Sequence, residues 1–133
     1  MIDGDRPGTE QPFQYAVIRA VPRVDRGECI NVGVVVYCQA ADFLQARTHL
    51  DEERLRVLDA GVDVEAVRAA LDAVVAVCAG DPAAGPAATG SRGERFGRLT
   101  APHSTVVQCG PVHSGVTDDP ARRLARLLEH LVR

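Results

Sequence analysis

The stretch that decides the fold is ECINVGVVVY, residues 28–37. Its centre, from Val32 to Val36, is apolar at every position, whereas a strand with one wet face alternates apolar and polar residues. Valine and isoleucine dominate it, and β-branched residues favour a pleated strand. The stretch therefore predicts a central strand covered on both faces. Gly33 within it predicts a bulge or a close backbone approach.

Two further strands flank this one along the chain. Residues 13–21 are rich in aromatic and β-branched side chains and end at Pro22, which cannot donate to a ladder. Residues 22–27 are polar and long enough for the turn of an antiparallel hairpin. Residues 43–50 follow a short turn and form the third expected strand.

Helices are predicted at three places. Residues 51–59 carry acids in the first turn, which complement the helix dipole, and Gly61 follows as a stop. Asp63 is the expected N-cap of a longer helix, whose apolar residues recur at the helical period as far as Cys78. Asp119, followed by Pro120, is the expected N-cap of the final helix.

The remaining segments complete the predicted order of elements. Residues 80–103 are rich in Ala, Gly, Pro, Ser and Arg without a clear period, which predicts a long flexible loop. Residues 104–109 are the fourth strand candidate, and residues 1–12 are expected to be a disordered leader. The order within residues 13–133 is strand, strand, strand, helix, helix, loop, strand, helix. We therefore predict a single domain of the α+β class, with a mainly antiparallel sheet of about four strands packed by helices.

Composition narrows the functional classes. The 133 residues suit one domain, and the net charge of −3 with 4% aromatic residues argues against a nucleic-acid binder. The sequence shows neither a signal peptide nor an apolar run of membrane-spanning length, so a cytoplasmic protein is expected. The four cysteines include no Cys-x-x-Cys spacing, which predicts reduced, structural thiols and no metal site. Phosphate-loop, dinucleotide and nucleophile-elbow motifs are also missing from the sequence, so we predict no cofactor.

One group of polar residues surrounds the predicted hairpin and is the candidate ligand-binding site. It comprises Arg19, Arg26, Glu28, Asn31 and Arg47. A strand charge that faces a core must be paired or must line a cavity, so Arg19 either pairs with Glu28 across the hairpin or helps to bind an anion. Asn31, within an apolar strand, is expected to fix the local backbone or a ligand.

A second group of polar residues follows the fourth strand candidate. It contains His103, Ser104, His113, Ser114, Asp118 and Asp119, with His113 the candidate ligand-binding residue. These residue types occur in hydrolase triads but are equally expected in loops and helix caps, and only geometry identifies a triad. The arginines at 92, 95 and 98 form a basic cluster, expected either to be solvated or to contact a phosphate or an acidic partner.

Two separated elements carry a resemblance to a known family. One is Arg26-Gly27-Glu28 followed by Asn31-Val32-Gly33, and the other is Thr117-Asp118-Asp119-Pro120. Together with the stretches around Tyr15–Arg19, Leu99–Pro102 and Ser104–Gln108, the chain resembles the family known as domain of unknown function 3037 over about residues 13–132. Members are often encoded beside a HipA-like kinase, so the resemblance implies such a kinase, or another protein, as a partner.

Two functional hypotheses follow. The first is a non-catalytic accessory or interaction module, which fits the small size and the missing catalytic motifs. Residues 80–103 and the final helix are then the expected partner surface.

The alternative is an enzyme or binding protein for a phosphorylated or carboxylated small molecule. In it the arginines of the hairpin group hold the anion, Glu28 acts as base or orienter, and His113 acts as acid. The sequence leaves open whether the chain forms a homo-oligomer.

Overall fold

The stretch at residues 28–37 contributes the central strand of an antiparallel sheet. The structure is a computed structural model and describes residues 9–133. In it β2 (Ile30–Cys38) lies between β1 (Gln11–Ala20) and β3 (Phe43–Thr48). Residues 32–36 of β2 are all buried, as a strand covered on both faces requires. The predicted central strand is confirmed.

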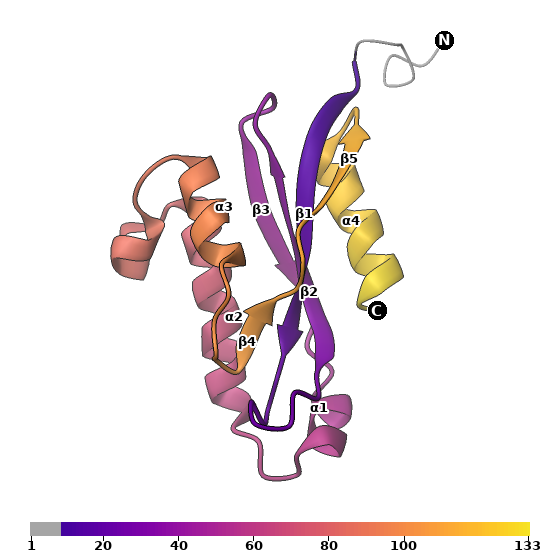
Figure 1. The fold of residues 1–133 in the computed structure, drawn as a ribbon, viewed down its shortest axis with the longest axis vertical. Coiled ribbons are helices and arrows are strands. Elements are labelled where there is room, and N and C mark those ends of the chain that lie inside the picture. The colour runs from indigo at the N-terminus through magenta and orange to yellow at the C-terminus, as the bar shows by residue number, and fades with distance from the viewer. Residues whose placement is uncertain (1–8) are drawn as a thin grey trace.

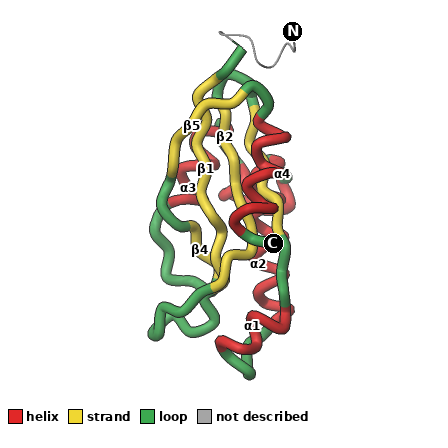
Figure 2. The backbone as a smooth tube through the Cα atoms, turned by 90° about the vertical axis from the view of Figure 1, so that its right-hand side faces the viewer, coloured by secondary structure: helices red, strands yellow, loops and turns green. Residues whose placement is uncertain are grey.

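The opposite side of β1 pairs with two short strands rather than one. β4 (Val107–Cys109) pairs with the end of β1, and β5 (His113–Thr117) pairs with its first half, so the two follow one another along the same side of β1 (Figure 2). Over residues 9–133 the sheet therefore has five strands, in the order β3-β2-β1-β4 with β5 beside β1. The α+β class is confirmed, and β5 is an addition to the predicted elements.

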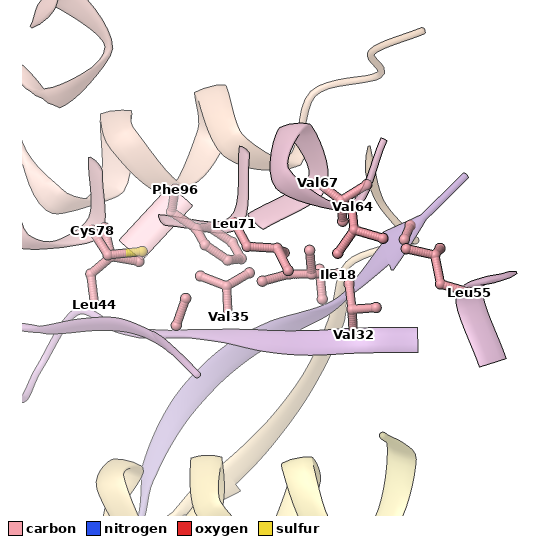
Figure 3. Close-up of a cluster of buried hydrophobic side chains, with 13 residues drawn as sticks. Ile18, Val32, Val35, Leu44, Leu55, Val64, Val67, Leu71, Cys78 and Phe96 are labelled. Carbon is pink, nitrogen blue, oxygen red and sulfur yellow. The ribbon is translucent and has the colours of Figure 1, made fainter. Parts of the chain in front are cut away.

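Helices cover both faces of this sheet. α2 (Val64–Ala79) and α3 (Arg92–Thr100) lie on one face, and α4 (Pro120–Leu131) lies on the other (Figure 1). The short α1 (Glu52–Leu58) leads from β3 toward α2. The larger core fills the space between the sheet and α2 and α3, where Val35, Leu71 and Phe96 meet (Figure 3). A smaller core under α4 contains Val34, Val36, Leu124 and Leu128.

The helix starts at Asp63 and Asp119 follow the predicted caps, and Asp51 caps α1 in the same way. The carboxylates of Asp51, Asp63 and Asp119 accept hydrogen bonds from the backbone N–H groups of Arg54, Ala66 and Arg122, at 3.0–3.2 Å. Each of these bonds satisfies one backbone donor that a helix start leaves free. Within residues 9–133, no helix is long and apolar enough to cross a membrane.

The prediction of a loop throughout residues 80–103 was wrong. The 3₁₀ segment η2 (Pro82–Ala88) and then α3 occupy this region. Ser91 and Glu94 form a capping box at the start of α3, and Phe96 anchors the helix in the larger core. Two arginines of the predicted basic cluster hold the segment together, because Arg95 donates to the carbonyl groups of Gly90 and Cys78, and Arg98 to those of Ala87 and Thr89.

The predicted disordered leader falls mostly on residues 1–8, which lie outside the described residues. Its last two residues, Gln11 and Pro12, belong to β1.

A bulge in β2 makes both faces of that strand apolar. Ile18 lies opposite Gly33 and Arg19 lies opposite Asn31, so Val32 is the extra residue. The bulge reverses the alternation of side chains. The larger core contains Val32 at the bulge and Val35 after it, and Ile30 and Tyr37 pack against that core. Val34 and Val36 belong to the core under α4.

Candidate functional site

The hairpin residues do not gather into the predicted site. The Arg26 guanidinium and the Glu28 carboxylate pair with each other at 2.8 Å, in the turn, with 55% and 47% of their side chains exposed. A surface pair of this kind contributes about 1 kcal/mol or less. The suggested Arg19–Glu28 pair is not formed among the described residues. The reason is register: Arg19 lies opposite Asn31, whereas Glu28 precedes β2 in the turn.

The side chain of Asn31 binds the backbone at the end of α4. Its side-chain Nδ2 donates a hydrogen bond of 2.9 Å to the carbonyl oxygen of Leu131, at the end of α4. A carbonyl in the last turn of a helix has no partner within the helix, so the bond satisfies it. Asn31 thereby ties the C-terminal end of α4 to the central strand.

Arg47 and His113 lie at opposite edges of the sheet. Arg47 is exposed on β3, opposite Val34 of β2, and His113 is exposed on β5, opposite Tyr15 of β1. Three strand spacings separate β3 from β5, or about 14 Å. The imidazole of His113 packs against the ring of Tyr15, with 5.2 Å between the ring centroids. Arg26, Glu28, Arg47 and His113 thus surround no common ligand position.

The polar residues of the suggested triad serve local structure. Asp119 is the N-cap of α4, and Asp118 pairs with Arg122 at 2.8 Å. The Nε2 atom of His103 lies 3.0 Å from the carbonyl oxygen of Arg98 in the segment after α3. Caps and loop contacts, the alternative interpretation of this group, account for these three residues.

A groove that the sequence did not reveal lies beside β4 on the face of α2. It has a volume of 560 Å³ and almost entirely apolar walls. Small residues of α2, among them Ala70 and Ala73, form one wall, and the side chains of Val107 and Cys109 form another. The ionisable groups at its edge besides Cys109 are Arg98 and His103, and the lining includes no acidic residue. The sequence signal for this groove was the series of alanines on α2, because small side chains leave space beside the helix.

A flat arrangement of side chains occupies the other face of β1. Glycines on the neighbouring segments make it possible, because a Cβ atom on Gly115 would lie 2.8 Å from the ring of Phe13, and one on Gly110 would lie 2.9 Å from the guanidinium carbon of Arg19. The ring of Phe13 therefore lies over Gly115, and the guanidinium of Arg19 lies over Gly110.

Burial sets the chemistry of two of the four free thiols. It raises the pKa of Cys78 to about 12, with a smaller increase from the nearby Cys109, and it raises the pKa of Cys109 to about 11. The thiolate is the reactive form of cysteine, so both residues should be poor nucleophiles at neutral pH.

We expect iodoacetamide at pH 8 to alkylate the exposed Cys29 at least tenfold faster than Cys78 and Cys109 in the native protein. Mass spectrometry of a labelling time course, followed by peptide mapping, measures the three rates.

The raised pKa values also predict that the free energy of unfolding falls as pH rises from about 9 toward 11, because the unfolded thiols lose their protons first. Equal labelling rates for Cys29 and Cys109 would contradict the burial that causes both effects.

Over residues 9–133, no three His, Cys, Asp or Glu side chains gather as a metal site would require.

No curated protein and no solved structure matches the chain. The model of one family, described as proteins of unknown function and designated DUF3037, matches residues 15–132. This match includes the hairpin, the groove and α4, and the chain belongs to the DUF3037 family.

Proposed function

We propose that this protein is a non-catalytic interaction module that binds a protein partner through the groove beside β4. The observation that carries the proposal is the groove itself: 560 Å³ of apolar space that the protein's own side chains leave open. Concave apolar surfaces of this size accept the anchoring side chains of a partner. The candidate acid–base residues give no comparable support, because Glu28 and His113 lie on separate parts of the fold.

The walls of the groove indicate the chemistry of the partner segment. Apolar side chains would contact Val77, Leu99 and Val107, and an acidic residue would complement the edge. Arg98 supports this, since among the described residues both of its side-chain hydrogen bonds use Nη2 and none uses Nη1 or Nε, while Glu94 meets part of its charge. The HipA-like kinase that the family resemblance implies is the first partner to test.

The alternative function, binding a phosphorylated or carboxylated small molecule with the hairpin residues, finds less support. It needs Arg26, Glu28, Arg47 and His113 to converge on one ligand. The Arg26–Glu28 pair is satisfied internally in an exposed turn, and Arg47 and His113 lie at opposite edges of the sheet.

A pair of arginine substitutions on α2 tests the proposal. Ala73→Arg fills the groove from an exposed position, whereas Ala69→Arg places the same side chain one turn earlier, where it does not line the groove. We expect Ala73→Arg to weaken binding to the co-expressed kinase at least tenfold, and Ala69→Arg less than twofold, because filling an anchor pocket removes about 1.4 kcal/mol or more. Size-exclusion chromatography and titration calorimetry measure the complex.

Two results would count against this function. If the kinase neither co-elutes nor releases heat on titration, the implied partner is wrong. If a complex forms and both variants weaken it equally, the groove is not the binding surface.

A further inference from the structure

Arg19 is a strand residue whose charge the protein leaves without a partner. Its side chain is partly buried, and within residues 9–133 its guanidinium makes no hydrogen bond and no ion pair. Partial removal of a cation from water without compensation is unfavourable. This position is therefore better suited to a bound anion than to the free protein.

Gly110 determines where the guanidinium lies. Arg19 shares its face of the sheet with Phe13, Tyr15 and Val17, and it could turn toward α4 or toward β4. Because Gly110 lacks a Cβ, the guanidinium lies over that residue, at the break between β4 and β5. It is thus directed to the β4 side of β1, away from Asn31 and the end of α4.

The surroundings of Arg19 lie outside the core under α4, which among the described residues reaches β1 at Phe13 and Tyr15. α4 packs against β2 and β3, and Figure 2 shows it to one side of β1, β4 and β5. The register gives the residues of β4 and β5 on this face: Gly115 lies opposite Phe13, His113 opposite Tyr15, and Gln108 opposite Arg19. None of these residues is acidic. These strand neighbours therefore supply no counter-charge to Arg19.

We propose that Arg19, held flat on Gly110, is a recognition point for a carboxylate on an acidic segment of a partner protein. The guanidinium fork matches a carboxylate with two parallel hydrogen bonds. The Tyr15 and His113 rings, tilted by 33° to each other, and the half-exposed Val112 provide an adjoining surface for a polypeptide. One arginine without a second cation beside it suits a singly charged carboxylate better than a phosphate.

This inference shares with the proposed function the assumption of a protein partner, but it concerns the opposite face of the sheet. Val107 and Cys109 of β4 line the groove, and Gln108 between them, which also borders the groove, lies opposite Arg19 in the register of the sheet. The two surfaces can therefore be tested separately. Ala73→Arg should leave anion binding at Arg19 unchanged, and substitutions at Arg19 should leave the groove intact.

The experiment is an NMR titration of the full chain with pentaglutamate, following the Arg19 Nε–H and Gly110 amide signals. Inorganic phosphate and a five-nucleotide thymidine oligomer serve as parallel probes. We expect Arg19→Gln to raise the dissociation constant for pentaglutamate about tenfold, as the loss of charge-assisted hydrogen bonds predicts. Arg47→Gln removes the same charge from an exposed position on the same face of the sheet and should change it less than twofold.

Gly110→Ala tests the geometry without changing the charge. Its Cβ would displace only the end of a flexible side chain, so the protein should stay folded and bind pentaglutamate several-fold more weakly. Equal effects of Arg19→Gln and Arg47→Gln would show diffuse electrostatic attraction and overturn the proposal. Half-saturation by phosphate or the oligonucleotide at lower concentration than by pentaglutamate would overturn the assignment to a carboxylate.

Discussion

Replacing Gly33 by alanine should lower the free energy of unfolding by about 3 kcal/mol, the range of severe overpacking in a buried strand. A Cβ atom at this position would lie 2.7 Å from the carbonyl oxygen of Arg47 and 3.2 Å from side-chain carbons of Ile18 and Thr48. The nearest of these atoms belongs to the backbone of β3, so relief requires movement of a whole strand. Urea denaturation followed by circular dichroism measures the loss.

Gly97→Ala is the matched control for this change. Gly97 lies within α3, and a Cβ atom there would meet nothing within 4 Å. Alanine in a helix interior is favoured over glycine by about 0.5–1 kcal/mol, so this variant should be slightly more stable. If Gly33→Ala were as stable as the wild type, the tight bulge between β2 and its neighbours would be wrong.

The features that local chemistry determines could be predicted from the sequence. The apolar run at residues 32–36 identifies a strand buried on both faces, because no wet face could tolerate it. The N-caps at Asp63 and Asp119 depend on a side chain and the backbone three residues later, which the sequence shows directly. These signals positioned most of the fold correctly.

The features that were missed depend on distant partners. β5 is short, exposed and begins with polar residues, and only its pairing with the first half of β1 makes it a strand. α3 contains two glycines and a single buried aromatic residue, so its helical period is weak, and Phe96 forms the helix by docking against the core. Such segments acquire their structure from tertiary contacts rather than from propensity.

The candidate site shows the same division. The sequence correctly marked Arg19 as an unusual charge in an apolar strand, but its predicted partner depended on the register of the hairpin. The two residues are apart because Arg19 lies opposite Asn31, whereas Glu28 lies in the turn before β2. The groove beside β4 could not be predicted, because it exists only where α2, the segment after α3 and β4 meet.

The second large effect is expected at α4. Leu124 is 1% exposed and packs with Phe13, Val34 and Val36 in the core that joins this helix to the sheet. Leu124→Ala should reduce the free energy of unfolding by about 3 kcal/mol, from lost burial and the cavity left behind. Leu131→Ala, on the same helix but 36% exposed, should cost less than about 1 kcal/mol. Chemical denaturation of both variants provides the comparison.

In the Leu124→Ala variant, we expect α4 to lose more local stability than β2. α4 is a twelve-residue helix, too short to persist alone in water, so its helical state depends on the contacts of Leu124 and Leu128 and on the bond from Asn31 to Leu131. Amide hydrogen exchange should therefore accelerate in α4 more than in β2, which keeps the larger core on its other face. Equal acceleration in both elements would mean that the two cores unfold as one unit. Preferential loss in α4 would instead show that this helix is a separate layer, able to detach while the central strand stays buried under α2.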